Sequence, residues 1–446
     1  MSLLLRIFVP FAFGYYLSYV FRNVNAAIFR DLVADLGLGA SDLGLLTSAY
    51  FFVFAAAQLP VGVLLDRYGP RRVNAALFLI AAAGAFGFTL GHTVTVLVIS
   101  RALIGLGVSA GLMAAMKAFT DYFPIVRLPA LNGMLMAIGG LGAMTATAPV
   151  DAALRLAGWR GLFFALGLLS LGVAAVILAV APKGAPAAAG GAARRSAEGT
   201  AGESANATAT RTGPAAAHPA APQNRSTLEL LRGVRAVLVD PFFWRVTAVS
   251  CTTLGPAMAL QALWVAPWLR DVPGMDRATA ARMLFLLTVA LTAGFLASGK
   301  IVDWGRRIGL RMIDVMALAS LLSALALAAL AAGAVRSGVA LWCGYIFAAA
   351  GATLAYPILA GRFPGALTGR VNASLNMATF VTAFAVQYGI GPVLDRWAGA
   401  DGTWPPAAYG IAFGVIVALQ GLALLAALPL LRRVPGAPPE VSGRIR

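Results

Sequence analysis

Long apolar runs dominate this 446-residue sequence, and short polar segments separate them. Hydrophobic residues make up 60% of the chain, charged residues only 11%, and the mean hydropathy is +0.83. Soluble globular domains carry about 25% charged residues, whereas a membrane-spanning helix needs about 20 consecutive, mostly apolar residues. The pattern therefore predicts an all-α membrane protein in which each long run crosses a lipid bilayer.

The apolar runs predict twelve membrane-spanning helices, and an even number places both ends of the chain on one side. With Met1 inside, the inner short segments carry 16 Lys and Arg and the outer ones 7. Because basic residues concentrate on the cytoplasmic side, both termini are predicted to be cytoplasmic. The predicted spans are 6–29, 42–65, 72–91, 94–119, 129–153, 160–181, 242–268, 279–302, 312–334, 337–360, 371–393 and 406–431.

A polar segment divides the predicted spans into two groups of six. Residues 182–225 are rich in Ala, Gly, Ser, Thr and Pro and have almost no large side chains. Such a segment cannot bury enough surface to offset the entropy of ordering it. We therefore expect a first six-helix half over 1–181, a disordered cytoplasmic linker with a short surface helix over 182–240, a second half over 241–432 and a cytoplasmic tail over 433–446.

Two short patterns recur about half a chain apart. Gly62-Val-Leu-Leu-Asp66 and Gly299-Lys-Ile-Val-Asp303 are each followed by a pair of arginines. Leu131-Asn132-Gly-Met-Leu135 likewise matches Val371-Asn372-Ala-Ser-Leu375. Duplicated six-helix units are the sequence trace of a transporter built from two halves, so the recurrence predicts that architecture.

The segment from Gly62 to Arg72 resembles a loop motif of the major facilitator superfamily, Gly-x-x-x-Asp-Arg-x-Gly-Arg-Arg. Here Pro70 interrupts the motif, and the paired arginines follow one place later. The fourth span carries Arg101-Ala-Leu-Ile-Gly105-Leu-Gly107, which resembles the family's Arg-x-x-x-Gly-x-Gly. The resemblance covers the chain apart from the linker and the tail. It implies a membrane transporter with the major facilitator fold, twelve transmembrane helices in two six-helix halves.

The loop motif is a cytoplasmic latch in that family. A carboxylate at a helix end can hold arginines or the positive N-terminus of a neighbouring helix; alternatively, these charges only anchor the topology. Arg101, Gly105 and Gly107 are expected to be structural, with Arg101 pairing with helix-end carbonyls. The residues to which the resemblance and the repeat assign the latch are Asp66, Arg67, Arg71, Arg72, Asp303, Arg306 and Arg307.

Arg22 is a fixed positive charge inside the first apolar run. On a continuous helix it shares one face with Tyr15, Ser18 and Asn25. A guanidinium at membrane depth costs about 2.5–3.5 kcal/mol, so it should face the interior of the bundle or a wet cavity. This favours an anion-binding role; alternatively, Arg22 reaches a lipid headgroup or pairs with a structural carboxylate.

The first span also resembles that of the organophosphate:phosphate antiporters and related anion carriers. These proteins have Tyr-x-x-Arg followed by Asn, as in Tyr19-Val-Phe-Arg22-Asn23, and their arginine contacts the substrate anion. This chain has Lys117 where they place a histidine and Ala259 where they place a second arginine. The departures argue against an organophosphate as the substrate.

Other polar side chains in the spans are candidates for the same site. Lys117 is the natural second cation; alternatively, it only extends toward cytosolic water. Polar stripes on the seventh and eleventh spans could orient a small solute, or only form hydrogen bonds between helices. The stripes comprise Thr253, Gln261, Trp264 and Trp268, and Asn372, Asn376, Thr379 and Gln387.

Several kinds of site are missing from the sequence. None of the 17 acidic residues lies near the centre of a span, whereas proton-driven drug exporters usually have a titratable carboxylate in their cavity. We find no metal-ligand cluster, phosphate-binding loop or Ser/His/Asp set. We therefore expect no enzyme activity, no cofactor and no bound metal. The basic residues are scattered between apolar runs, which argues against nucleic acid as a partner.

Together these features predict a monomeric secondary transporter that moves a small organic anion across the bacterial inner membrane by alternating access. Its partners are the small-molecule substrate and the lipid bilayer. The alternatives are an exporter of amphipathic drugs or siderophores and, from another class, a non-transporting membrane sensor. The predicted substrate-binding residues are Tyr19, Arg22, Asn25, Lys117, Gln261, Trp264, Asn376 and Gln387.

Overall fold

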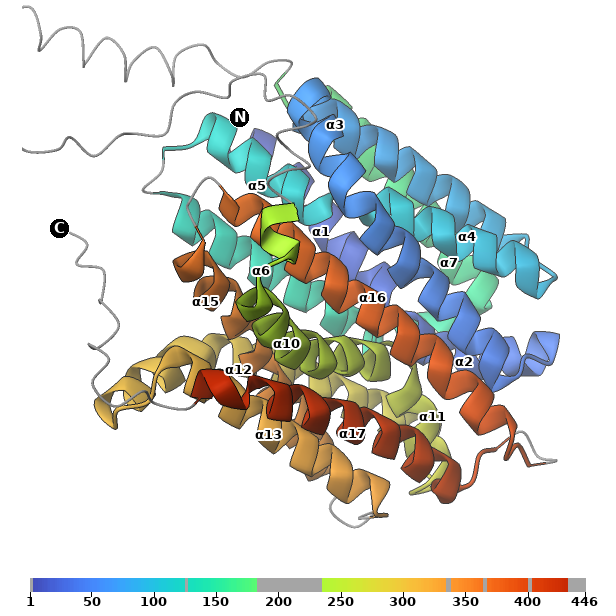
Figure 1. Cartoon of the computed structure of the whole chain (residues 1–446). Helices are drawn as coiled ribbons and strands as arrows, with labels where there is room; N and C mark the ends of the chain where they lie inside the picture. The colour runs from blue at the N-terminus through green and yellow to red at the C-terminus, as the bar shows by residue number, and fades with distance from the viewer. Residues whose placement is uncertain are drawn as a thin grey trace, which may run out of the picture.

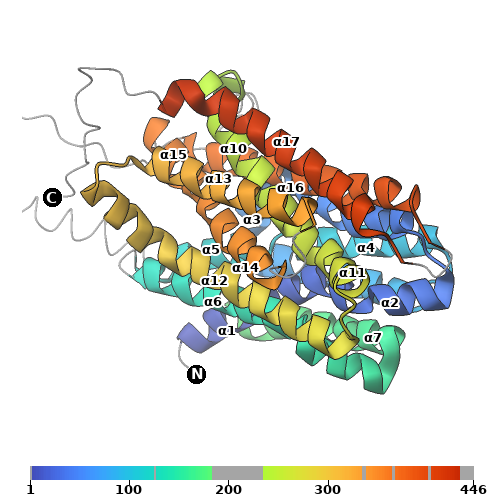
Figure 2. The same ribbon diagram turned by 90° about the horizontal axis from the view of Figure 1, so that it is seen from below.

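A computed structural model describes residues 3–124, 127–182, 235–333, 338–363, 367–399 and 403–431. Every regular element in these ranges is a helix, and the helices pack side by side in a bundle (Figures 1 and 2). The predicted linker, except for Pro182 and its last six residues, lies outside the described residues, as does the predicted tail. The helices of the first half are α1 (Leu3–Asn23), α2 (Asn25–Leu36), α3 (Ala40–Thr89), α4 (Val94–Val108), α5 (Gly111–Tyr122), α6 (Leu128–Thr145) and α7 (Ala148–Val180).

The described residues of the second half form ten helical segments, two of which are not α-helical. The π-helical segment η2 follows α10 directly, and the 3-10 segment η3 follows α14 directly. The segments are α10 (Pro241–Ala259), η2 (Leu260–Trp264), α11 (Val265–Asp271), α12 (Arg277–Arg307), α13 (Met312–Ala331), α14 (Gly338–Ala349), η3 (Ala350–Leu354), α15 (Ala355–Arg362), α16 (Thr368–Asp395) and α17 (Pro406–Leu431).

Two long helices each contain a sharp turn at a glycine. α3 turns at Gly69 (φ 79°) and α7 turns at Gly158 (φ 64°), so each contributes to two passes across the bundle. Side chains other than glycine rarely adopt these positive φ angles. The described residues contain eleven helices long and apolar enough to cross a membrane, and the shorter apolar stretch Gly133–Thr145 belongs to one further pass. The prediction of an all-α membrane protein with twelve spans in two halves is confirmed.

The first, fourth, seventh and tenth passes are all interrupted. Val24 separates α1 from α2, and Ser109 and Ala110 separate α4 from α5. The segments η2 and η3 interrupt the two corresponding passes of the second half. Two of these interruptions fall within the predicted spans 6–29 and 94–119, and Val94–Tyr122 is nevertheless long and apolar enough to cross a membrane as one span. Local departures from the α-helix often mark functional positions, and transporters commonly bind solutes at broken helices.

The two halves meet most extensively along α3 and α16, which lie side by side (Figure 1). Aromatic rings fill this contact: the ring centres of Phe54 and Phe380 are 4.5 Å apart. At Gly391 the backbones approach so closely that an added Cβ atom would lie 2.8 Å from the Cα atom of Ser41. The fold therefore holds side chains of the two halves within contact distance at its centre.

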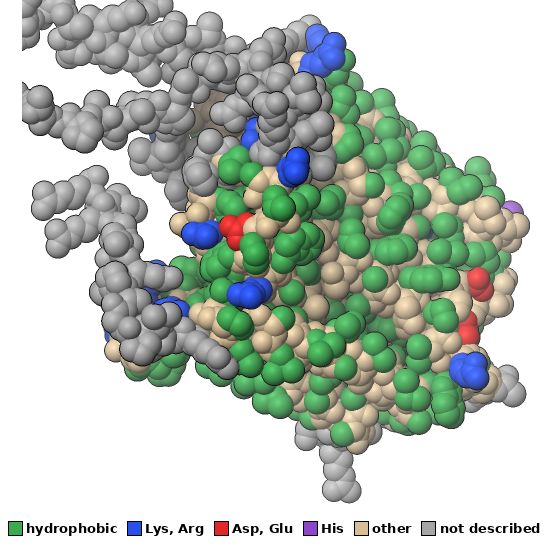
Figure 3. All heavy atoms as spheres, viewed as in Figure 1, with side chains coloured by type: hydrophobic (Ala, Val, Ile, Leu, Met, Phe, Trp, Pro, Cys, Tyr) green, Lys and Arg blue, Asp and Glu red, His purple; other side chains and the backbone are tan. Residues whose placement is uncertain are grey.

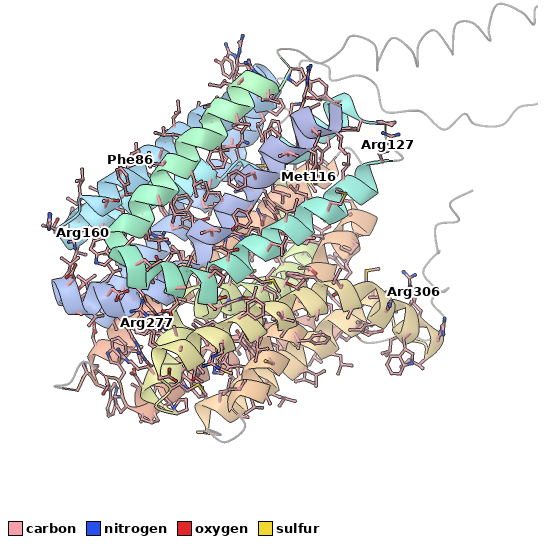
Figure 4. All side chains as sticks on the ribbon, turned by 180° about the vertical axis from the view of Figure 1, so that it is seen from behind. Phe86, Met116, Arg127, Arg160, Arg277 and Arg306 are labelled. Atoms are coloured by element: carbon pink, nitrogen blue, oxygen red, sulfur yellow. The ribbon has the colours of Figure 1, made fainter. Side chains whose placement is uncertain are left out.

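The outer surface is largely apolar along its length, with charged side chains toward both ends (Figure 3). Exposed side chains include Leu296 (78%), Leu422 (62%) and Leu425 (61%). Such a surface suits a lipid bilayer rather than water. Arg160 and Arg277 lie at one end of the molecule, and Arg127 and Arg306 lie at the other (Figure 4). We refer to these as the Arg277 end and the Arg306 end.

Candidate functional site

Arg22 lies in the last turn of α1 among aromatic rings from both halves. Its guanidinium carbon is 4.7 Å from the ring centre of Tyr19, 5.2 Å from that of Phe54 and 5.3 Å from that of Phe380. Its Nε is buried and has no hydrogen-bond partner among the described residues. None of the ion pairs found among the described residues involves Arg22. The rings stabilise the cation through their π faces but do not neutralise its charge.

Two amide side chains meet one turn away on the same pair of helices. The Nδ2 of Asn376 on α16 donates a hydrogen bond to the Oε1 of Gln58 on α3 (3.3 Å). The hydroxyl of Tyr356 on α15 donates to the Oδ1 of Asn376 (3.2 Å). Gln58 is buried, whereas Arg22, Tyr356 and Asn376 are partly exposed. The seven residues Tyr19, Arg22, Phe54, Gln58, Tyr356, Asn376 and Phe380 are called the central cluster below.

Asn25 does not face the central cluster through its amide. It begins α2, is 2% exposed, and donates from Nδ2 to the Oγ1 of Thr47 on α3 (2.6 Å). Val24, which separates α1 from α2, keeps helical backbone angles (φ −59°, ψ −26°), and its N–H donates to the carbonyl of Val20 (3.0 Å). The Oδ1 of Asn25 is buried and accepts no hydrogen bond from any described residue. A substrate contact by Asn25 stays a prediction.

Gln261, Trp264 and Gln387 are buried and form hydrogen bonds within the second half. Gln261 donates from Nε2 to the Oγ1 of Thr288 on α12 (3.1 Å). The indole of Trp264 donates to the backbone carbonyl of Gln387 on α16 (3.1 Å). These residues therefore form hydrogen bonds between helices, which was the alternative to solute binding in the sequence analysis. A binding role for the three residues stays a prediction.

Lys117 lies in a cavity of about 340 Å³ that does not contain Arg22 in its lining. Other lining residues are Phe11, Arg71 and Arg72. Arg22 follows Phe11 by eleven residues on α1, which is about 16 Å along the helix axis. The structure therefore does not bring together the two cations that the sequence analysis combined in one site, because Lys117 lies toward the other end of α1.

Arg101 is completely buried against the end of α1. Its Nη1 donates to the backbone carbonyl of Phe21 (3.1 Å), and its guanidinium carbon is 5.3 Å from the ring centre of Tyr50. Added Cβ atoms would lie 2.6 Å from the carbonyl oxygen of Tyr50 at Gly105 and 2.3 Å from the backbone nitrogen of Ala81 at Gly107. Both glycines therefore allow α4 to pack directly against α3.

The residues assigned to the latch make mostly local contacts. Arg71 donates to the carbonyl of Leu178 near the end of α7. The guanidinium carbon of Arg67 is 5.3 Å from the ring centre of the adjacent Tyr68. Asp303 and Arg306 form an exposed ion pair of 3.9 Å within α12, and Arg307 is also exposed. The side chain of Asp66 lies outside the described residues. The latch role stays a prediction.

Ionic contacts connect the two halves at the Arg277 end. Arg277 at the start of α12 binds Asp31 of α2 through two hydrogen bonds of 3.0 Å each, and it also contacts Asp151 of α7. Both carboxylate oxygens of Asp395, at the end of α16, accept backbone N–H groups at the start of α3: Ala40 and Ser41 each donate at 2.7 Å. We call these contacts the end closure.

A further ion pair at this end lies within the first half. Arg160 and Trp159 donate hydrogen bonds to the carboxylate of Asp35. These bonds hold the pKa of Asp35 below its ordinary value, and the carboxylate is accordingly ionised at neutral pH. Arg160 and Arg277 lie at the same end of the molecule (Figure 4).

Sequence reasoning missed Phe54, Gln58, Tyr356 and Phe380. The available signal was the lone amide of Gln58 in an apolar run, four positions after Phe54 and therefore on the same helical face. The same spacing separates Asn376 from Phe380. Without knowledge that α3 pairs with α16, neither spacing points to Arg22.

The sequence model of the Major Facilitator Superfamily matches residues 11–387. The chain belongs to the Major Facilitator Superfamily. This assignment confirms the resemblance found in the loop after the second span. Members of this superfamily are transporters, so the protein is a multi-pass membrane transporter rather than a member of an enzyme family.

Individual relatives within the superfamily are distant. The chain is 25% identical over 445 residues to the "Probable sulfoacetate transporter" of Cupriavidus necator, covering 97% of this chain and 95% of that protein. It is 29% identical over 112 residues to a nitrate/nitrite transporter of Picosynechococcus, covering 25% and 21% of the two chains.

Solved structures share the fold. A bacterial homologue of the human lysosomal transporter Spinster aligns with a TM-score of 0.70 at 16% identity. The alignment covers 96% of this chain and 98% of that one.

Proposed function

We propose that this superfamily member is a secondary transporter of a small organic anion in the bacterial inner membrane. The observation that carries the proposal is Arg22, whose guanidinium lies among rings of both halves without an ion pair to a described carboxylate. A charge at membrane depth without a counter-ion is unfavourable. A bound anion would supply the missing negative charge. It would bind at the interface of the halves, because the rings around Arg22 come from both of them.

The similarity to a probable sulfoacetate transporter also supports an anionic substrate, because sulfoacetate is an organic anion. That similarity extends over nearly the full length of both chains. With both termini in the cytoplasm, as the distribution of basic residues favours, the Arg277 end faces the periplasm. The end closure then blocks the periplasmic side in the described conformation. Alternating access would break these contacts and form others at the Arg306 end.

Neutralisation of the Arg22 charge by a bound anion would couple substrate binding to alternating access. An unpaired cation resists transfer into a fully closed, dry interior, and a bound anion removes that penalty. The loaded protein would therefore reorient more easily than the empty one. The alternative substrate class, amphipathic drugs or siderophores, does not require this cation.

The test is transport in proteoliposomes combined with thermal shift on purified protein, using organic anions and lipophilic cations in parallel. Arg22→Gln should weaken anion binding by about 10- to 100-fold, because a hydrogen bond to a charged group contributes about 1.5–3 kcal/mol. Arg22→Lys should retain part of the binding. Arg282→Gln is the matched control, because Arg282 is exposed on α12 and donates to the carbonyl of Ala278 in its own helix. Wild-type transport by Arg22→Gln would refute the proposal.

A further inference from the structure

We propose that Gln58 and Asn376 recognise a second polar group of the substrate, one helical turn from the anionic group held by Arg22. This inference rests on the proposed function, because it assigns further chemistry to the same site. It names the substrate class as a small organic anion with a second hydrogen-bonding group on a short chain. A hydroxyl, a second carboxylate or an amide would satisfy this requirement.

The alignment of α3 with α16 places the amide contact next to the aromatic contact. Gln58 follows Phe54 by four positions, and Asn376 precedes Phe380 by four positions. Four residues of an α-helix rise about 6 Å and return to the same face. The aromatic contact of 4.5 Å and the amide contact of 3.3 Å are therefore successive layers between the two helices. Arg22 lies against the aromatic layer, so the amide layer is one turn away.

The amides of the second layer have unused hydrogen-bonding capacity. Each amide has two N–H donors and an oxygen with two lone pairs. The structure shows Gln58 donating to the carbonyl of Phe54 (3.2 Å) and accepting from Asn376 (3.3 Å), while Asn376 accepts from Tyr356 (3.2 Å). These distances are at or beyond the long end of the usual range. Exchange of such bonds for bonds to a ligand changes the net energy little.

The hydrogen bond between the side-chain amides of Asn376 and Gln58 also connects the two halves of the transporter. Gln58 belongs to the first half, whereas Tyr356 and Asn376 belong to the second. Movement of one half against the other disturbs a contact of this kind. A substrate with a second polar group can bridge the two amides and replace the bond between them, whereas a plain monoanion cannot. The second polar group therefore contributes both to affinity and to reorientation of the loaded protein.

The experiment compares matched anions on the purified full-length protein. Binding is measured by calorimetric titration and thermal shift with propanoate against lactate, and with ethanesulfonate against 2-hydroxyethanesulfonate and sulfoacetate. Wild type should prefer the ligands with a second polar group by about fivefold to tenfold, the value of one net hydrogen bond. Gln58→Met and Asn376→Leu should lose this preference, so that the two ligands of each pair bind with equal affinity.

A control variant separates this effect from the loss of any buried amide. Gln420 on α17 is 1% exposed, and neither polar atom of its side chain has a hydrogen-bond partner in the part of the chain that the structure describes. Gln420→Met should leave the preference unchanged. If Gln58→Met fails to fold, Tyr356→Phe removes one hydroxyl from the same layer and should reduce the preference.

Two negative results have different meanings. An equal affinity of wild type for both members of each pair, or an undiminished preference in the Gln58 and Asn376 variants, would overturn this inference and leave the anion site intact. Binding of no anion at all by wild type would overturn the proposed function, and this inference with it.

Discussion

Arg277 of α12 and Asp31 of α2 form a bidentate ion pair between the two halves, with Nη1 to Oδ1 and Nη2 to Oδ2 each 3.0 Å apart. The two side chains are about one-third exposed (30% and 29%), and Asp151, the second carboxylate on Arg277, is 7% exposed. Bidentate, partly buried pairs of this kind are stronger than exposed single contacts. The pair is therefore a principal contact of the end closure.

Arg277→Gln should open the end closure more often. The change leaves two carboxylates without their cation, and we expect a shift of roughly 1–2 kcal/mol toward the open form, discounted for solvent screening. The measurement is the rate at which a thiol reagent labels Thr147→Cys, beside the closure, in a variant without Cys251 and Cys343. Labelling should become about 5- to 30-fold faster.

The control for this experiment is Arg282→Gln, which removes a cation from the same helix without touching either carboxylate. Its labelling rate should equal that of the parent. An unchanged rate in Arg277→Gln would show that the ion pair does not hold this end closed.

Asp395 should contribute to the same closure through the N-terminus of α3. Its carboxylate accepts the N–H groups of Ala40 and Ser41, which carry the positive end of the helix dipole. Asp395→Ala should cost about 0.5–2 kcal/mol, the range measured for loss of a helix cap, and Asp395→Asn should cost less. The labelling assay and the unfolding temperature measure both variants. Equal labelling rates and unfolding temperatures in Asp395→Ala and Asp395→Asn would contradict a role for the Asp395 side chain as a helix cap.

Lys117 should matter less than Arg22 for binding in the described conformation, because it lines a different cavity. Lys117→Gln is expected to change anion affinity by less than about threefold, whereas Arg22→Gln should abolish most of it. Titration of the two variants with one anion compares them directly. An equal loss in both would place Lys117 at the substrate in another conformation.

Gly107 should not tolerate a side chain. A Cβ atom there would lie 2.3 Å from the nitrogen of Ala81, so Gly107→Ala must push α4 away from α3. Overpacking of this kind costs about 1–3 kcal/mol. Gly172→Ala is the matched control, because nothing lies within 4 Å of its added Cβ atom. Thermal unfolding should show a lower midpoint for Gly107→Ala and a nearly unchanged one for Gly172→Ala.

Local sequence pattern predicted the architecture well because the bilayer imposes it. Continuous apolar runs of about 20 residues form helices in lipid, because a helix pairs its backbone groups within the run itself. The recurrence of the loop motif indicated two halves, and the family assignment confirms this. The pattern did not predict the interruption at Val24, although the polar residues Arg22, Asn23 and Asn25 surround it.

The candidate site was predicted only in part. A cation within an apolar run is visible in the sequence, so the position of Arg22 along the chain was enough to single it out. The neighbours of Arg22 could not be found in this way, because Phe54 and Phe380 are ordinary residues of helices more than 300 positions apart in the chain. Lys117 was grouped with Arg22 by its charge and because it stands where related anion carriers place a histidine, whereas in the structure it lines a cavity that Arg22 does not line.

By itself, the sequence determined that the chain crosses a bilayer twelve times, divides into two related halves and carries an arginine at membrane depth. These properties follow from composition and spacing along the chain, because the bilayer acts on each apolar segment separately. Only the tertiary structure decided which side chains surround Arg22, that Gln58 meets Asn376, and which end is closed. Those relationships depend on the register between distant helices, and side-chain packing across the whole bundle sets that register.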